Sequence, residues 1–282
     1  MKKYLLILLV LTTRVYAYCT PDNNTCFSCG DDCVAELTYS KDESNHEVGT
    51  LTVYGTGDNG AGQMRGYFPT GEEPNRTTTA PWRDKLGDIN NVVITEGVTN
   101  VGRYTFSGAK NITHLELPES VDTIEDYAFM DSTLDTVNTL KNVKSIGSGA
   151  FHRTNLTSVE LSPEIETIKS FAFSLTDLES IVIPDSVLTV EGYAFYELPS
   201  TAKIYCRDTS ERKCKDILDD VTKGSNKLVQ YTQVGNSYFY DGKWYEKPND
   251  LSANNYIKKR IYTVDEANFV SGKKNKIFLR YK

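Results

Sequence analysis

The chain has 282 residues, of which 24% are charged and 11% aromatic, and its formal net charge is −7 at pH 7. A chain of this length can fold as one elongated domain or two compact ones. The acidic balance argues against a protein whose whole surface binds nucleic acid.

Residues 1–17 predict a signal peptide. Two lysines precede an apolar run from Tyr4 to Leu11 that is too short to span a bilayer, and cleavage would follow Ala17. No later segment is apolar enough to cross a membrane. We therefore expect an exported protein, secreted or held at the cell surface, without a transmembrane segment.

Residues 18–85 predict a β-rich N-terminal cap. An even number of cysteines in an exported chain favours disulfides, although the spacing of Cys26 and Cys29 also suits zinc or a redox pair. Four cysteines allow three pairings, and the sequence does not choose among them. The cysteines of the cap are Cys19, Cys26, Cys29 and Cys33.

Two alternating segments of the cap, 34–39 and 50–54, predict strands. The Gly-rich loop 55–60 that follows lacks the Lys-Ser/Thr pair of a phosphate-binding loop, so we interpret it as a turn. The residues expected to face the core are Ala35, Leu37, Tyr39, Leu51 and Val53.

Residues 86–205 contain an internal repeat. Phenylalanine recurs every 22 residues at Phe129, Phe151, Phe173 and Phe195, and apolar residues recur in phase before each. We expect all of these apolar positions to face the core, because stacked units of a solenoid bury one core together. For the unit that ends at Phe173 the positions are Leu156, Val159, Leu161, Ile165, Ile168 and Phe171, and Tyr104, Tyr127 and Tyr193 correspond to Phe171 in other units.

The third unit departs from this pattern. It places Thr139 where leucine or isoleucine is expected. A threonine at a core position must find a hydrogen-bond partner or lie in a looser turn.

The pattern L-x-x-V-x-L-P, then V-x-x-I, then Y-A-F, resembles the BspA-like leucine-rich repeats of bacterial and protozoan surface proteins. The resemblance covers residues 89 to about 205, and the segment before it is similar to the module that often precedes such repeats. It implies a mainly β, right-handed solenoid of about five units that serves adhesion or protein binding and is not an enzyme.

Side chains between the core positions of the repeat strands should line one face of this solenoid. We predict that this face binds an extracellular protein or glycan, and an ordinary solvated sheet face is the alternative. The face carries no aromatic anchor and no arginine. Its residues are Asn91, Val93, His114, Glu116, Thr136, Asn138, Ser158, Glu160, Ser180 and Val182.

Residues 206–232 predict a C-terminal cap. A last, degenerate strand ends near Cys206, and the apolar spacing over 211–221 is typical of a helix. Cys214 would lie on that helix, and we predict a disulfide between Cys206 and Cys214.

Residues 233–282 predict a separate small α+β module that begins with a β-hairpin around Asp241-Gly242 and continues with a helix and a final strand. Its ten Lys and Arg and five Asp and Glu give a net charge of +5, whereas residues 18–232 carry −15. Such a tail could attach the protein peripherally to an anionic envelope, which makes a structural, envelope-associated protein the alternative function.

The sequence gives little support to catalysis. None of the three histidines lies in a nucleophile or metal motif, and we predict no catalytic residues, no metal site and no cofactor. Glu116 and Glu160 project from strands two units apart. This pair leaves a glycan-cleaving enzyme as a remote alternative.

Overall fold

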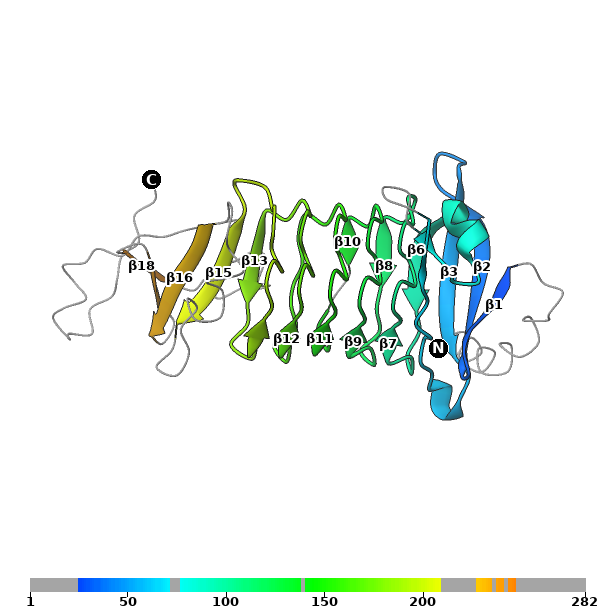
Figure 1. The fold of residues 1–282 in the computed structure, drawn as a ribbon, viewed down its shortest axis with the longest axis horizontal. Helices are drawn as coiled ribbons and strands as arrows, with labels where there is room; N and C mark the ends of the chain where they lie inside the picture. The colour runs from blue at the N-terminus through cyan, green and yellow to red at the C-terminus, as the bar shows by residue number, and fades with distance from the viewer. Residues whose placement is uncertain are drawn as a thin grey trace, which may run out of the picture. The chain divides into compact units, whose positions relative to one another are not determined.

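The protein is described here by a computed structural model that covers residues 25–71, 77–137, 140–208, 227–234, 237–240 and 243–246. In these residues the regular elements are strands β1 to β18 and two short 3-10 helices (Figure 1). The repeats form a β-solenoid of about five turns. The chain divides into two compact units, Met1–Asn138 and Thr139–Lys282.

The first unit contains a six-stranded sheet in the order β1-β2-β3-β6-β8-β10. Strands β1 (Cys26–Gly30), β2 (Cys33–Lys41) and β3 (Glu47–Gly55) form an antiparallel meander. The repeat strands β6 (Ile89–Ile94), β8 (His114–Glu116) and β10 (Thr136–Val137) pair in parallel. Because β3 also pairs in parallel with β6, the cap and the repeats of this unit share one sheet.

The other elements of the first unit are short. They are η1 (Asp58–Gly60), β4 (Pro69–Thr70), β5 (Thr77–Thr78), η2 (Arg83–Asp88), β7 (Asn100–Val101) and β9 (Thr123–Ile124). Trp82 precedes η2 and covers the first repeat. Its ring is fully buried and stacks on Phe106 with 5.7 Å between centroids, and its Nε1 donates to the carbonyl oxygen of Thr105 at 3.3 Å.

The core of the cap is close to the prediction. The aliphatic residues expected to face inward are all buried: Ala35, Leu37, Leu51 and Val53. Tyr39 was expected to join them, and this is wrong because it is exposed. Strand β2 continues past the core at this point, and the Tyr39 hydroxyl instead donates to Asp88 Oδ2 at 3.1 Å.

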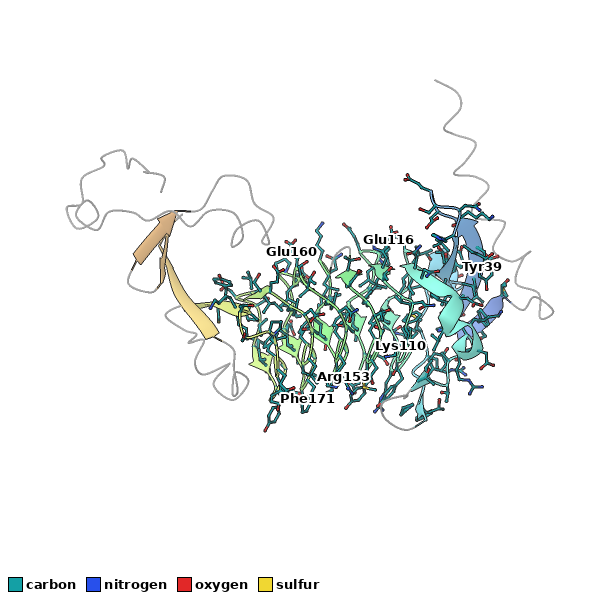
Figure 2. All side chains as sticks on the ribbon, turned by 90° about the horizontal axis from the view of Figure 1, so that it is seen from above. Tyr39, Lys110, Glu116, Arg153, Glu160 and Phe171 are labelled. Atoms are coloured by element: carbon teal, nitrogen blue, oxygen red, sulfur yellow. A yellow bond between two sulfur atoms is a disulfide. The ribbon has the colours of Figure 1, made fainter. Side chains whose placement is uncertain are left out.

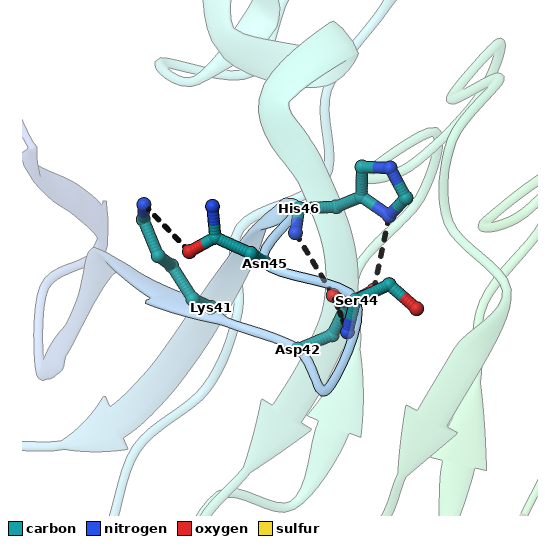
Figure 3. Close-up of polar contacts among 5 residues, drawn as sticks. All are labelled: Lys41, Asp42, Ser44, Asn45 and His46. Atoms are coloured by element: carbon teal, nitrogen blue, oxygen red, sulfur yellow. Dashed lines mark hydrogen bonds and ion pairs between the residues drawn. The ribbon is translucent and has the colours of Figure 1, made fainter.

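The turn between β2 and β3 is closed by side-chain hydrogen bonds (Figure 3). Asp42 Oδ1 accepts the backbone N–H groups of Ser44 at 2.8 Å and His46 at 2.9 Å, and Lys41 Nζ donates to Asn45 Oδ1 at 3.0 Å. The bond from the His46 backbone is the main reason that the pKa of Asp42 lies below its ordinary value. This Asx-type turn fixes the register in which β2 returns as β3.

A disulfide joins Cys29 to Cys33 across the turn between β1 and β2, where Gly30 pairs with Cys33. Of the three pairings that the sequence leaves open, this bond belongs to the one that joins Cys19 to Cys26. Cys26 is itself disulfide-bonded, and Cys19 lies outside the described residues.

In the second unit, β11 (Ser145–Ile146), β12 (Thr167–Ile168) and β14 (Thr189–Val190) pair in parallel in that order. Strands β13 (Ser180–Ile183), β15 (Lys203–Asp208) and β16 (Lys227–Val234) form a second parallel set. Strands β17 (Ser237–Tyr240) and β18 (Lys243–Glu246) extend that sheet in antiparallel pairing.

Two predicted domain boundaries fall inside these strands. The boundary between residues 205 and 206 lies within β15, and the one between 232 and 233 lies within β16. The predicted hairpin is present as β17 and β18, and β17 pairs antiparallel with β16 in the sheet that also contains β15.

Several C-terminal predictions fall on residues outside the description. They are the helix over 211–221, the turn at 241–242, and the helix and final strand of the tail. Cys206 is buried and disulfide-bonded. Its pairing with Cys214 stays a prediction, because Cys214 is also outside the described residues.

The repeat core is organised on phenylalanine, as the period predicts. Phe106, Phe129, Phe151, Phe173 and Phe195 are fully buried. Phe106 and Phe129 stack at 5.3 Å in the first unit, and in the second unit Phe173 stacks on Phe151 at 5.4 Å and on Phe195 at 5.8 Å. The backbones interlock beside the rings, since the N–H groups of Phe106, Phe151 and Phe173 each bond the carbonyl of an alanine one repeat later, as from Phe173 to Ala194 at 2.8 Å.

Two positions of each repeat turn have a left-handed backbone. One lies two residues before the core phenylalanine and one lies two residues after it, and the φ angles range from 52° at Glu197 to 77° at Gly108. The first positions are Tyr104, Tyr127, Gly149, Phe171 and Tyr193, and the second are Gly108, Asp131, Arg153, Leu175 and Glu197. Positive φ is uncommon for bulky residues, so its recurrence is a property of this turn.

This backbone corrects the predicted core. Phe171 and Tyr193 were expected to face inward, but 39% and 49% of their surfaces are exposed, and Tyr127 is only half-buried. The left-handed residue turns its side chain away from the core, and Tyr104 is the one aromatic side chain at this position that is buried. An apolar residue in the sequence pattern is therefore displayed and not packed.

The structure also corrects the inward position that was predicted for the strand of the third repeat. Leu140 is buried and bridges to Leu161 of the next repeat. The inward position expected at Thr139, which lies outside the described residues, is thus taken one residue later. The register is restored by Val143, which is buried as predicted.

Candidate functional site

The predicted binding face is a row of polar side chains on the sheet of the first unit. Asn91 pairs with His114, and His114 pairs with Thr136, so the three lie side by side on adjacent strands. His114 and Thr136 are exposed, whereas Val92 and Leu115 on the other face of the same strands are buried. The alternation that the sequence predicts is therefore present in this unit.

Hydrogen bonds along this row fix the histidine. Thr136 Oγ1 donates its proton to the carbonyl oxygen of Thr113 at 3.2 Å, so it acts as acceptor toward His114 Nδ1, also at 3.2 Å. This arrangement is satisfied when His114 Nδ1 carries a proton and donates it to Thr136 Oγ1. At the other end of the row, Asn91 Nδ2 donates to Thr50 Oγ1 at 3.4 Å.

A second row beside the first is acidic. Val93 pairs with Glu116 on one side and with Thr52 on the other, and Thr52 pairs with Glu36 of the cap. Glu116 is exposed, and Figure 2 shows it at the outer edge of the ribbon. Two carboxylates on one sheet face favour a partner with basic groups.

Sequence reasoning missed the part of the face that the cap supplies. Glu36, Thr38, Thr50, Thr52 and Tyr54 are on the outward positions of β2 and β3, in register with the repeat strands. Burial raises the pKa of the half-buried Tyr54. The signal was available, because these residues alternate with the predicted core residues. What the sequence did not show is that β3 pairs with β6.

The second unit carries its own section of the face. Ser158 bridges to Ser180, Ser180 pairs with Lys203, and Val182 pairs with Tyr205. Ser158, Ser180 and Val182 are half-buried and Glu160 is exposed, while Asn138 lies outside the described residues. Lys203 and Tyr205 were not among the predicted face residues. Tyr205 in this unit and Tyr54 in the first unit are aromatic side chains, which the predicted face lacked.

The described residues hold no group of three or more His, Cys, Asp or Glu side chains that could bind a metal ion. A cleft of about 510 Å³ in the cap contains Asp31 and Asp32, and Arg65 forms an ion pair with Asp31 at 3.2 Å. Glu116 and Glu160, the remote candidates for a glycosidase pair, belong to different units. No helix among the described residues has the length and apolar character that a membrane span requires.

Comparison with protein families matches residues 84–201 to the BspA type leucine rich repeat region, in six copies. Residues 84–201 are a BspA-type leucine-rich repeat region. The matched range agrees closely with the predicted repeat segment 86–205 and contains one copy more than the five units expected. The BspA-type repeats thus include every predicted face residue from Asn91 to Val182.

One solved structure shows the same fold, and a second aligns less closely. A leucine-rich repeat protein from Eubacterium ventriosum aligns with a TM-score of 0.53 and 22% identity, over 77% of this chain and 48% of that chain. A leucine rich cell surface protein from Faecalibacterium prausnitzii aligns with a TM-score of 0.34 and 18% identity, over 83% of this chain and 60% of that one. This chain therefore spans about half the length of the first. No curated protein matches the sequence.

Proposed function

We propose that this protein is a secreted or surface-exposed, non-enzymatic binding protein, and that an extracellular protein docks on the sheet face of its BspA-type repeats. The observation that carries the proposal is the in-register row of Thr50, Asn91, His114 and Thr136 on a sheet whose opposite face is the core. Neighbouring strands are about 4.8 Å apart, so this row is a closely spaced set of hydrogen-bonding groups.

Export is supported by the cysteines as well as by the predicted signal peptide. Cys29 and Cys33 form a disulfide across a short turn, and Cys26 and Cys206 are disulfide-bonded. Disulfides persist in oxidising compartments and are rare in the cytosol. The bonds therefore suit a protein that works outside the cell.

The chemistry of the face specifies the kind of partner. The polar row offers donors and acceptors, and Glu36 and Glu116 add negative charge beside it. A basic protein surface would meet this charge and be guided toward the face. A few residues near the centre of the interface should carry most of the affinity, and His114 and Glu116 are the exposed candidates.

The test is a binding screen of the full chain against extracellular proteins, followed by titration of the best binder. His114→Ala and Glu116→Ala should each weaken binding by about tenfold or more, if they are central contacts. Asp122→Ala is the matched control, because Asp122 is an exposed acid of the same repeat outside the sheet face. Equal affinity for the wild type and both face variants would rule out this face.

A further inference from the structure

The acidic row of the first unit crosses four strands and has a carboxylate at each end. Glu36 on β2 pairs with Thr52 on β3, Thr52 pairs with Val93 on β6, and Val93 pairs with Glu116 on β8. All four side chains are on the face opposite the core, since the residues before and after each of them are buried. We call these four residues the acidic row.

Both carboxylates of the acidic row are available to a partner. Glu116 is exposed and Glu36 is half-buried, and neither forms an ion pair within the part of the chain that the structure describes. The one lysine in the four strands, Lys41, lies at the far end of β2, where it pairs with Glu47. The negative charge of the acidic row is therefore not neutralised within this sheet.

The sheet sets the distance between the two carboxylates. Glu36 and Glu116 are three strand spacings apart, and at about 4.8 Å per spacing their backbones are about 14 Å apart. In an extended chain, residues i and i+4 point to the same side and are about 13 Å apart at about 3.3 Å per residue. In an α-helix the same two residues would be only about 6 Å apart. Two basic residues four positions apart in an extended segment therefore match the acidic row.

The residues between and beside the carboxylates add to this match. Residue i+2 of such a segment would lie over Thr52 and Val93, which are both half-buried and accept a small apolar side chain. At one end of the row, burial raises the pKa of Tyr54 and the charge of Glu36 adds to the shift, so the two side chains are close together. A cation bound by Glu36 would thus also have an aromatic ring within reach.

We propose that the acidic row binds an extended segment of the partner protein that carries Lys or Arg at positions i and i+4 and a small apolar residue at i+2. This inference rests on the proposed docking of a protein on the sheet face, and it specifies the part of that protein that meets the face. Charge complementarity and the matching spacing carry it, because opposite charges in register fix which partners fit.

The experiment compares two acetylated and amidated peptides of the same composition, Lys-Ser-Val-Ser-Lys and Ser-Lys-Val-Lys-Ser. Only the first places two lysines and the valine on one side of an extended chain with the spacing of the acidic row. Each peptide is titrated into the isotopically labelled full chain while backbone amide resonances are followed. We expect saturable shifts at Thr52, Val93 and Glu116, and about threefold to fivefold tighter binding of the first peptide, since one further exposed ion pair adds about this much.

Three variants test whether the spacing causes the preference. Glu36→Gln and Glu116→Gln each remove one charge and keep the side-chain shape, so the two lysine peptides should bind each variant equally. Asp122→Asn is the matched control outside the sheet face and should keep the preference. The double variant Glu36→Lys, Glu116→Lys should reverse the charge requirement and prefer Glu-Ser-Val-Ser-Glu over Ser-Glu-Val-Glu-Ser.

The inference is overturned by an absence of saturable shifts on the acidic row, by equal affinity of the two lysine peptides for the wild type, or by a preference that survives either glutamine variant. If the peptides bind equally but Glu116→Ala still weakens a screened partner, the sheet face remains the docking site and only the spacing rule fails. A screened partner that binds every face variant as tightly as the wild type would overturn the proposed function, and this inference with it.

Discussion

Phe171 and Phe173 lie two residues apart in one repeat turn, yet Phe173 is fully buried whereas 39% of Phe171 is exposed. The left-handed backbone at Phe171 separates them by turning one ring outward. The same residue type therefore builds the core at one position and the surface at the other.

This pair gives a matched test of the repeat core. Phe173→Ala should cost about 3–5 kcal/mol of unfolding free energy, because it leaves a cavity between the rings of Phe151 and Phe195. Phe151→Ala should cost about the same. Phe171→Ala should cost less than about 1 kcal/mol, since it leaves no buried cavity. Denaturant unfolding measures the three losses. Equal losses for Phe173→Ala and Phe171→Ala would show that the assigned register is wrong.

The second left-handed position predicts a stabilising substitution. Leu175 has a φ of 56° and is exposed, and a left-handed backbone costs a residue with a Cβ about 1–2 kcal/mol. Leu175→Gly should relieve this and raise stability by up to about 1 kcal/mol. Leu188 is also exposed and has no positive φ, so Leu188→Gly should lower stability slightly. Thermal midpoints of the two variants should move in opposite directions; a fall in both would contradict the argument.

Tyr67 predicts a third change. Its side chain is buried against Trp82, and its hydroxyl has no hydrogen-bond partner among the residues that the structure describes. Tyr67→Phe should therefore be neutral or stabilising by about 1 kcal/mol, because it removes an unsatisfied buried group. Tyr39→Phe is the control and should not stabilise, since the Tyr39 hydroxyl donates to Asp88.

The same tyrosine has a signature at high pH. Burial raises the pKa of Tyr67 to about 12, whereas an exposed tyrosine in the unfolded chain ionises near 10. The neutral form is thus favoured by folding, and its contribution is complete below pH 10 and lost as pH rises toward 12. Unfolding titrations should show a smaller loss of stability over this range for Tyr67→Phe. An unchanged slope would show that Tyr67 does not titrate with unfolding.

The tail can be tested by two truncations. A chain that ends at Glu246 keeps every described strand, whereas one that ends at residue 226 loses β16, β17 and β18 and exposes β15 as an edge. We expect the first to keep the thermal midpoint of the full chain and the second to aggregate, because an unpaired edge strand templates association. Scanning calorimetry and size-exclusion chromatography measure both. Aggregation of the longer chain would show that residues 247–282 complete the fold.

The chain that ends at Glu246 also tests whether the tail attaches the protein to an envelope. If the basic tail attaches the protein, full chains should leave anionic vesicles as salt shortens the Debye length from about 10 Å at 0.1 M to about 3 Å at 1 M. The chain that ends at Glu246 should not bind them. If it stays bound at high salt, the tail is not the anchor.

Periodicity predicted the core phenylalanines and the stacking of successive repeats on one core, because burial imposes a regular apolar spacing on the sequence. It could not predict that Phe171 and Tyr193 face outward, since a positive φ at a bulky residue leaves no mark in an apolar pattern. It also placed the inward position of the third repeat at Thr139, where a one-residue shift puts Leu140 in the core.

The candidate site divides in a similar way. The order Asn91, His114 and Thr136 followed from the period, whereas the contribution of Tyr54 depended on which strand pairs with the cap, which is not encoded locally.

The two left-handed positions around each core phenylalanine have a consequence for how such a chain can change over generations. Within this one chain the first of them is tyrosine three times, phenylalanine once and glycine once, while the phenylalanine two residues later never varies. A mutation at the first left-handed position can therefore change the shape of the surface without disturbing the fold. Each duplicated repeat brings another such position, so a lineage can acquire new recognition surfaces by copying and rewriting single turns.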